Sequence, residues 1–282
     1  MATEGIERPV GALHADTASL AAAAAAAGGD HVALIADGSV DEWHGAVSAA
    51  GGAPTSSYLV SVDDTVRGAA AGTVSPGGRH VGGGVVLATV EAPVADPAAY
   101  LAAVLSECAE SGTGTVVVDD LSALLPDDAD AMETVGRLVE TAAEFGLTFH
   151  ARVAGDGPVV SALARRLPGA DADADRALAE RLVAHLRETD PTNFGYLRRH
   201  WVDARRGLAA VDMTYPQSKQ VHAALPDTDT TPRTLGAALQ ALVKLGALGV
   251  WGDTVAANRY DLTGYDAARI DAVGAVLDDL AD

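Results

Sequence analysis

Short apolar runs alternate with helix-like patterns along roughly the first 160 residues of the chain. Most of these runs are rich in Val, Leu and Ala and have an uninterrupted apolar centre, which is typical of a strand buried on both faces. Such strands, when helices separate them, predict a mostly parallel sheet covered on both sides. We therefore expect one α/β domain over residues 1–170. The expected strands are 31–37, 57–61, 84–90, 115–120 and 147–153, and the expected helices are 43–50, 96–111 and 129–145.

The pattern changes after a stretch rich in Gly, Pro and Asp near residues 168–175, and we place a domain boundary there. The residues that follow predict a second domain over 171–282, which is mainly helical and contains one hairpin. Its order is helix, helix, short helix, helix, two strands and a last helix. After the first helix, the expected elements are 191–211, 217–225, 231–246, the strands 248–251 and 258–262, and 265–280.

The helix expected at 231–246 has two different faces. Thr231 is a natural N-cap, Pro232 suits the first helical position and Gly246 suits the end. The helix pair and the two-stranded wing at 248–262 follow the order of a winged helix-turn-helix, which this segment resembles. The apolar face carries Leu235, Leu239, Leu242 and Leu245, and the opposite face carries Arg233, Ala237, Gln240 and Lys244.

A winged helix-turn-helix implies binding to double-stranded DNA. The first turn of its second helix enters the major groove, where base edges carry a distinct code. Arg233 and Thr234 lie in that turn, and Arg pairs well with guanine. Lys219 and Arg259 are expected to contact phosphates. The complete set of expected DNA-binding residues is Lys219, Gln220, Thr231, Arg233, Thr234, Gln240, Lys244, Asn258 and Arg259.

Two segments carry a resemblance to a known family. They are 191–201, which reads PTNFGYLRRHW, and 258–262, which reads NRYDL. Both are similar to haloarchaeal TrmB-suppressor-type (TbsP-like) transcriptional regulators. The resemblance implies an N-terminal α/β domain before the winged helix, and a role in the transcriptional control of central carbon metabolism.

The composition fits a halophilic source. The formal net charge is −20, and Lys219 and Lys244 are the only lysines. Dense surface carboxylates hold water and cations in molar salt and repel one another when salt is removed. We therefore expect the protein to lose structure at low salt. Residues 1–170 hold 7 basic and 22 acidic residues, a net charge of −15, whereas residues 193–263 hold 8 and 6, a net charge of +2.

The local excess of positive charge is small, but molar salt shortens the Debye length to about 3 Å. Long-range attraction to DNA then contributes little, and a few close contacts are enough. Four arginines of this segment are open to two interpretations, phosphate contacts or ion pairs with the acidic surface. They are Arg198, Arg199, Arg205 and Arg206.

Residues 115–120, TVVVDD, resemble the Walker B strand of RecA-like ATPases. Such enzymes also need the phosphate loop G-x-x-x-x-G-K-[ST], and residues 1–170 contain no Lys. We therefore expect a degenerate RecA-like or Rossmann-like domain, with no catalytic residues, no cofactor and no metal site. An ATP-dependent enzyme with an unusual site remains an alternative. Asp37, Asp119 and Asp120 follow predicted strands and would line a crevice for a small effector, or lie in a solvated loop.

The last helix suggests a dimer. Ile270, Val273, Leu277 and Leu280 have helical spacing and would form a homodimer interface, or would pack within their own domain. The alternative function is an inactive RecA-like signalling or docking protein that uses its winged helix to bind other proteins, such as another regulator. Cys108, the single cysteine, is expected in the core, and no disulfide is possible. With no signal peptide and no apolar run near 20 residues, we expect a cytoplasmic protein with no membrane contact.

Overall fold

The computed structural model of the chain describes residues 11–52, 56–63, 77–82, 84–108, 112–126, 129–155, 157–251, 258–263 and 265–280. The chain divides into two compact units, unit 1 at 1–170 and unit 2 at 171–282. Each unit has buried apolar residues of its own. Within the described ranges, no helix has the length and apolar character needed to cross a membrane.

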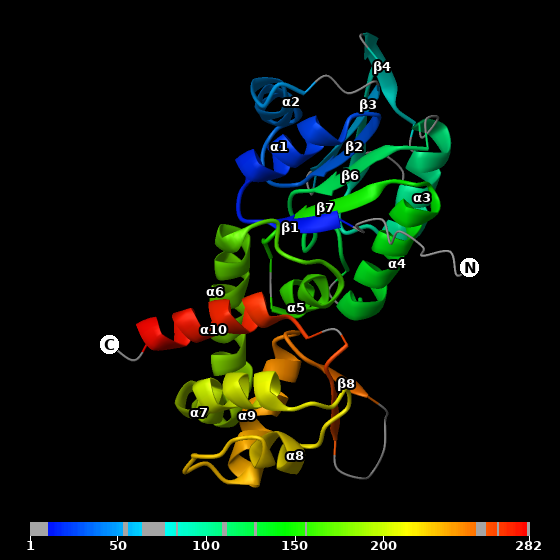
Figure 1. Ribbon diagram of the computed structural model, residues 1–282. Helices are drawn as coiled ribbons and strands as arrows, with labels where there is room; N and C mark the ends of the chain where they lie inside the picture. Colours follow the sequence, from blue (N-terminus) through cyan, green and yellow to red (C-terminus); the bar gives the residue numbers. More distant parts are fainter. Residues whose placement is uncertain are drawn as a thin grey trace, which may run out of the picture. The chain divides into compact units, whose positions relative to one another are not determined.

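Unit 1 is built on a seven-stranded sheet with the strand order β1-β7-β6-β2-β3-β5-β4 (Figure 1). All neighbouring strands are parallel except β4, which runs antiparallel to β5 at one edge. The prediction of an α/β domain with a mostly parallel sheet is therefore confirmed. The strands are β1 (Gly11–His14), β2 (Asp30–Ile35), β3 (Ser56–Asp63), β4 (Arg79–Gly82), β5 (Val85–Glu91), β6 (Gly114–Val118) and β7 (Thr148–Arg152).

Helices cover both faces of this sheet (Figure 1). On one face α1 (Thr17–Ala27) and α2 (Val40–Ala49) pack together, and on the other α3 (Pro97–Cys108), α4 (Ala131–Glu144) and α5 (Gly157–Arg166) form a second layer. Burial of apolar area on both faces is the main force that holds such layers together. The core under α1 and α2 contains Leu20, Ala33, Ile35, Trp43, Val47, Leu59 and Val117.

Three elements of unit 1 were not expected from the sequence. β1 and β4 are four-residue strands at the two edges of the sheet. Neither has an apolar run, and the neighbouring strands β7 and β5 recruit them through backbone hydrogen bonds. α5 begins at Gly157 and Pro158, which the sequence analysis took as part of a breaker-rich stretch. Pro is tolerated in the first turn of a helix because its missing N–H has no helical partner there.

Unit 2 consists of five helices and a two-stranded hairpin within its described residues. α6 packs against α10, and α7 packs against both α9 and α10. The expected wing tip at 252–257 lies outside the described residues. The elements are α6 (Ala172–Thr189), α7 (Pro191–Ala210), α8 (Ser218–Ala223), α9 (Pro232–Lys244), β8 (Gly249–Trp251), β9 (Arg259–Asp261) and α10 (Ala267–Asp279).

Candidate nucleic-acid interface

The helix α9 begins and ends where its local sequence requires. The Thr231 hydroxyl oxygen accepts the backbone N–H of Thr234 at 3.2 Å, and Pro232 is the first helical residue. The helix ends before Gly246, whose φ of 70° lies in the left-handed region that favours glycine. The leucines at 235, 239 and 242 are fully buried. Their burial turns the opposite face of α9 outward.

The turn between α8 and α9 is fastened to α7. One carboxylate oxygen of Asp203 on α7 accepts the hydroxyl of Thr230 at 2.6 Å and that of Thr228 at 3.0 Å. The imidazole Nε2 of His222 lies 2.6 Å from the carbonyl oxygen of Thr230. A Cβ atom added to Gly236 would lie 3.3 Å from Ser218, so α8 and α9 are in close contact. These contacts fix the first turn of α9 relative to α7 and α8.

The hairpin is joined to the helix pair through Tyr260, which is 3% exposed. Its hydroxyl donates to the carbonyl of Gly236 at 3.2 Å, and its backbone N–H donates to the carbonyl of Pro216 at 2.9 Å. The N–H of Leu262 donates to the carbonyl of Thr214 at 3.0 Å. The strand β9 therefore pairs on one side with β8 and on the other with the segment that precedes α8.

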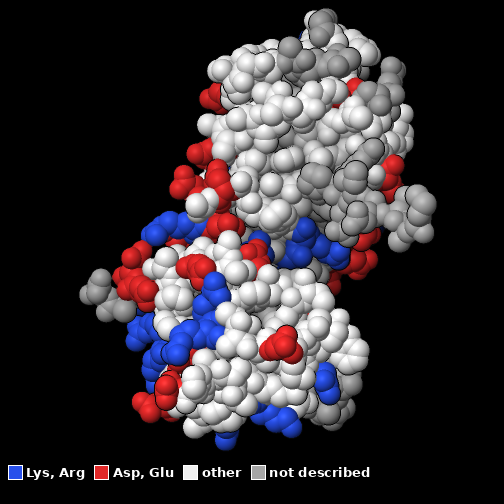
Figure 2. All heavy atoms as spheres, viewed as in Figure 1, with Lys and Arg blue, Asp and Glu red and all other residues white. Residues whose placement is uncertain are grey.

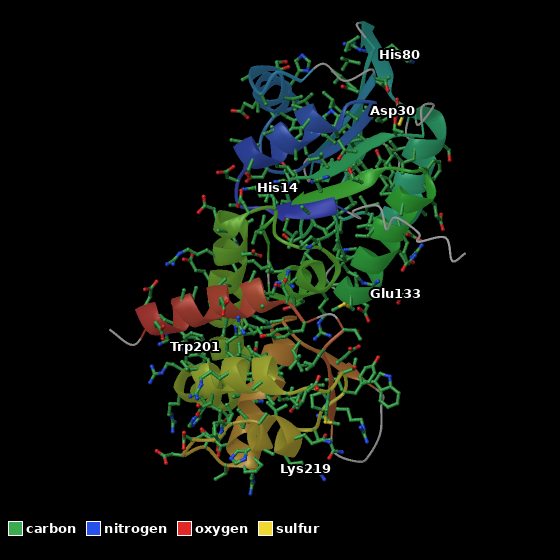
Figure 3. The ribbon with its side chains drawn as sticks, in the orientation of Figure 1. His14, Asp30, His80, Glu133, Trp201 and Lys219 are labelled. Carbon is green, nitrogen blue, oxygen red and sulfur yellow. The ribbon has the colours of Figure 1, made fainter. Side chains whose placement is uncertain are left out.

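Two of the predicted DNA-binding residues are exposed cations that have no acidic partner within the described residues. Lys219 is the second residue of α8 (Figure 3), and Arg233 is the second residue of α9. Both are exposed, and neither has a hydrogen bond or ion pair within the described part of the chain. Thr231 and Thr234 lie beside Arg233 and are tied to each other, with 2.9 Å between their hydroxyl oxygens. The structure thus places Lys219 at the start of α8, and Thr231, Arg233 and Thr234 at the start of α9.

The other predicted DNA-binding residues are engaged within unit 2. Lys244 was expected on the open face of α9, but its ammonium group forms an ion pair with the carboxylate of Asp190. This lysine lowers the pKa of Asp190. We therefore no longer count Lys244 among the free cations of the helix. The sequence could not show this pairing, because Asp190 precedes α7 and is far away along the chain.

Polar side chains of the hairpin and the helices bind one another. The amide nitrogen of Asn258 donates to Oε1 of Gln240 at 2.9 Å, and Oε1 of Gln220 accepts the N–H of Gln217 at 2.7 Å. Arg259 is exposed and donates to the carbonyl of Tyr215 at 3.4 Å. Gln240 and Gln220 are half-buried. The contacts of Asn258 and Arg259 hold the hairpin in place, and the contact of Gln220 caps α8. A DNA contact by the amides of Asn258, Gln240 or Gln220 would compete with these hydrogen bonds.

The four arginines with two interpretations divide evenly. Arg205 forms an ion pair with Asp271 at 2.6 Å, and Arg206 lies 3.9 Å from Asp203. Arg198 and Arg199 are exposed on α7 and have no ion pair within the described residues. On the face shown in Figure 2, the Lys and Arg side chains of unit 2 lie in several separate groups, with acidic or uncharged side chains between them. The basic surface is therefore made of a few separate cations, as the small local charge excess indicated.

The sequence analysis missed an exposed apolar surface on the hairpin. Val250 and Trp251 of β8 are 39% and 52% exposed, and Met213 before α8 is 44% exposed. The ring centroids of Tyr215 and Trp251 are 5.2 Å apart. The only signal for this surface in the sequence is the pair of consecutive large apolar residues, Val250 and Trp251, in a short strand. Successive side chains of a strand point to opposite faces, so in a two-stranded hairpin one of the two must face outward.

Comparisons with protein-family models, with curated proteins and with solved structures found no match. Function has to be inferred from the geometry of the two units.

At the position of the acidic crevice predicted in unit 1, hydrogen bonds and an ion pair connect the loop after β2 to the end of β6. Asp119 is 2% exposed, and its two carboxylate oxygens accept the backbone N–H groups of Ala36 at 2.7 Å and Asp37 at 2.9 Å. Burial raises the pKa of Asp119, and these two N–H groups act against that rise. Arg152 forms an ion pair with Asp37 and donates to the backbone carbonyl of Asp119 at 3.0 Å. Asp120 accepts the Ser122 hydroxyl at 2.6 Å.

Asp37 follows β2, Asp119 and Asp120 follow β6, and internal partners engage the carboxylates of all three. Asp119 joins the loop after β2 to the end of β6. Within the described ranges, no group of three His, Cys, Asp or Glu side chains could hold a metal ion. The geometry favours a structural role for Asp119 over the magnesium-binding role that a Walker B resemblance suggests.

The predicted dimerisation residues are mostly buried inside unit 2. Ile270 and Val273 are fully buried and Leu277 is 1% exposed, because α10 packs on α6 and α7. The prediction that these three residues form a dimer interface is therefore wrong, and packing within the unit is the interpretation that holds. Leu280 is 42% exposed and lines a groove beside Val276 and Val183.

Proposed function

We propose that unit 2 binds double-stranded DNA as a winged helix, with the first turn of α9 in the major groove. The observation that carries the proposal is the pair of exposed cations Lys219 and Arg233. Each is the second residue of its helix, and neither has an ion-pair partner within the described residues. The chain has 39 acidic and 19 basic residues, and most of its basic side chains could pair with a nearby carboxylate. Two unpaired cations at the starts of two packed helices therefore favour a polyanion as the ligand.

The local architecture supports the same proposal. Arg233 lies in the first turn of α9, and the N-terminus of a helix favours negatively charged groups such as phosphate. Asp203 holds the turn between these helices, so the first turn of α9 is held in place before any ligand arrives. The hairpin follows α9 directly and is fixed to it through Tyr260. A helix pair followed by an attached hairpin is the element order of a winged helix.

The remaining parts of the proposal concern the whole chain. The resemblance of residues 191–201 and 258–262 to haloarchaeal TrmB-suppressor-type regulators supports a role in transcription, in molar salt. Unit 1 has a mostly parallel sheet and no Lys for a phosphate loop, which supports a degenerate RecA-like domain that binds an effector or a partner. A homodimer would need a surface other than the buried face of α10.

The test begins with the full-length protein in molar KCl. Repeated selection from a library of random duplexes should enrich a sequence, and fluorescence anisotropy should then give its affinity. Arg233→Ala should lower that affinity roughly 5- to 150-fold, because a bidentate Arg–guanine contact contributes about 1–3 kcal/mol. Lys219→Ala should weaken binding to every duplex by about the same factor, whatever the sequence of the duplex, since a phosphate contact carries no sequence information.

The matched control is Arg187→Ala. Arg187 is an exposed arginine of α6, outside the helix pair and the hairpin. This variant removes the same charge, so its affinity should stay within about twofold of the parent if only local contacts count in molar salt. Equal losses for Arg187→Ala and Arg233→Ala, or no enriched sequence at all, would contradict the assignment. Circular dichroism of each variant checks that the fold is intact.

The exposed apolar hairpin favours a second candidate, protein docking. Trp251 is 52% exposed beside the ring of Tyr215, and aromatic residues are enriched in protein–protein interfaces. Trp251→Ser separates the two candidates. If this variant weakens an oligomer measured by light scattering and leaves the DNA affinity unchanged, the hairpin docks protein. If it lowers the DNA affinity alone, the hairpin belongs to the DNA interface.

A further inference from the structure

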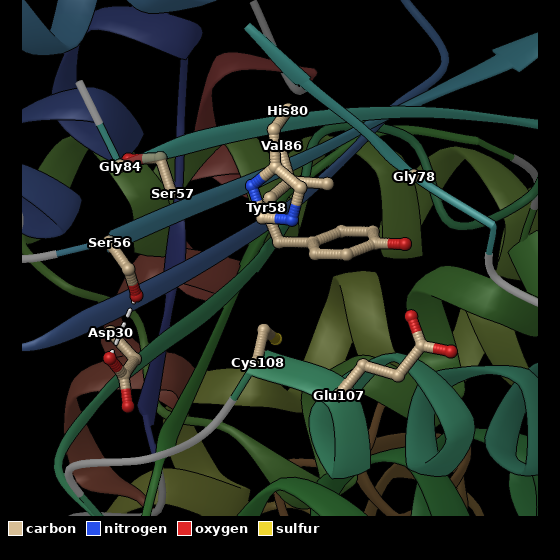
Figure 4. Close-up of a pocket in the computed structure, with 10 residues that line it drawn as sticks. All are labelled: Asp30, Ser56, Ser57, Tyr58, Gly78, His80, Gly84, Val86, Glu107 and Cys108. Atoms are coloured by element: carbon tan, nitrogen blue, oxygen red, sulfur yellow. Dashed lines mark hydrogen bonds between the residues drawn. The ribbon is translucent and has the colours of Figure 1, made fainter. Parts of the chain in front are cut away.

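A pocket of about 480 Å³ lies at the amino-terminal edge of the parallel sheet in unit 1 (Figure 4). It is lined by the starts of β2 and β3, by β4 and β5, and by the last turn of α3. Its volume falls in the range of ordinary small-molecule sites. The acidic junction around Asp119 lies at the opposite, carboxyl-terminal edge. The polar and aromatic lining residues are Asp30, Ser56, Tyr58, His80, Glu107 and Cys108.

Two carboxylates line this pocket. Figure 4 shows Asp30 with Ser56 on one side, Glu107 on the other side, and Cys108 between them. Asp30 is 3% exposed and accepts the Ser56 hydroxyl at 2.8 Å. Glu107 is exposed at the rim. No Lys or Arg is among the described residues that line the pocket.

Two of the other ionisable side chains that line the pocket add no charge to it. Burial, together with the carboxylates of Asp30 and Glu107, raises the pKa of the Cys108 thiol to about 12. Burial also raises the pKa of the Tyr58 phenol. Both groups are therefore neutral near pH 7. Cys108 was expected in the core, but it is only half-buried at the pocket wall.

We propose that this pocket binds a small organic cation that carries a protonated amine. The amine would lie near Cys108, in the part of the pocket that Asp30 and Glu107 make negative. The ring of Tyr58 would contact the cation, since aromatic rings attract cations. A phosphate or carboxylate ligand would meet two like charges, and the His80 imidazole is the one basic side chain among the described lining residues. The site is independent of DNA binding by unit 2, and its test leaves that proposal untouched.

Cys108 provides the test, because it is the single cysteine of the chain. The full-length protein in molar KCl is labelled with a cationic methanethiosulfonate, which carries trimethylammonium, and separately with the anionic sulfonate reagent. Intact-mass spectrometry follows both rates. The ratio of cationic to anionic rate is divided by the same ratio for free 2-mercaptoethanol. We expect a value of about 10, because the carboxylates beside the half-buried thiol favour the cation and repel the anion, and salt screens partly buried charges less than exposed ones.

Glu107→Gln should lower this value about threefold, since it removes one charge from the rim and keeps the side-chain shape. Glu144→Gln is the matched control, because Glu144 is an exposed residue at the end of α4 and does not line the pocket. It should leave the value unchanged. A value near 1, or an equal effect of the two substitutions, would overturn the proposal.

A second measurement tests occupancy. Putrescine or ethanolamine should slow the labelling of Cys108 by uncharged N-ethylmaleimide, with a saturable concentration dependence. Succinate, a four-carbon dianion that matches the four-carbon dication putrescine, should not slow it. Protection by an amine that is lost in Glu107→Gln supports the site. If neither amine protects Cys108, or if succinate does, the pocket does not bind protonated amines and the proposal fails.

Discussion

Replacing Gly274 by Ala tests whether α10 packs inside unit 2, as the structure shows, or is free to join a second copy. Gly274 lies on α10 against the indole of Trp201 on α7. A Cβ atom there would lie 2.3 Å, 2.5 Å and 2.6 Å from Cζ3, Cη2 and Cε3 of that ring. Carbon atoms in contact prefer about 3.5 Å or more. The ring would have to move by about 1 Å, although its Nε1 donates to Asp278 at 3.1 Å.

The expected cost follows from two opposing effects. Overpacking of a well-packed contact costs about 1–3 kcal/mol, and three close ring carbons favour the upper end. Ala is about 1 kcal/mol better than Gly inside a helix. Gly274→Ala should therefore lower the free energy of unfolding by about 2 kcal/mol. Gly195→Ala is the control, because the nearest atom to its Cβ is Nη2 of Arg199 at 3.8 Å. It should raise that free energy by about 1 kcal/mol.

Urea unfolding in molar KCl, followed by far-UV circular dichroism and by tryptophan fluorescence, measures both variants. The two should differ by about 3 kcal/mol, the sum of the two effects. The reasoning would be refuted by a Gly274→Ala protein as stable as Gly195→Ala. In that case α10 would not contact Trp201 in solution, and its apolar face would again be open to a partner.

Two further predictions concern unit 1. Asp119→Asn should lower the free energy of unfolding by about 1–3 kcal/mol, because an amide in place of this buried carboxylate cannot accept both backbone N–H groups, of Ala36 and Asp37. Asp37→Asn, which loses only an exposed ion pair, should cost less than about 1 kcal/mol. Burial lowers the pKa of His31 and of His150 to about 4, so both are neutral when the protein is folded. Their contribution to stability is complete above pH 6.5 and is lost as the pH falls towards 4, by up to about 3 kcal/mol for each.

Controls exist for both. Equal costs for Asp119→Asn and Asp37→Asn in urea unfolding would show that the buried carboxylate does not join β2 to β6. For the pH dependence, His31→Phe should flatten the fall in stability between pH 6.5 and 4, whereas His80→Gln, at an exposed histidine, should leave it unchanged. A fall of the same size in the His31→Phe protein would assign it to other groups.

The sequence predicted the parts of the fold that depend on local pattern. Continuous apolar runs gave the five central strands of unit 1, since such runs are favourable only when both faces are buried. Local cap chemistry gave the limits of α9, with Thr231 at its start and Gly246 at its end. The short edge strands β1 and β4 were missed, because a neighbouring strand rather than their own sequence holds them in the sheet.

The candidate DNA interface was predicted in the same partial way. Amphipathic spacing placed Arg233 on the outer face of α9, and the structure leaves it exposed there. The same spacing placed Lys244 on that face, where Asp190, 54 positions earlier in the chain, engages its ammonium group. Helical periodicity states which residues share a face. It does not state which distant side chain lies opposite that face.

The sequence by itself determined that α10 has an apolar stripe and that Cys108 lies on an apolar helical pattern. Only the tertiary structure decided that the stripe is buried against α6 and α7 and that Cys108 lines a pocket. The physical reason is that a hydrophobic surface gains the same free energy from any apolar partner that excludes water. Which partner excludes it depends on the positions of residues far apart in the chain.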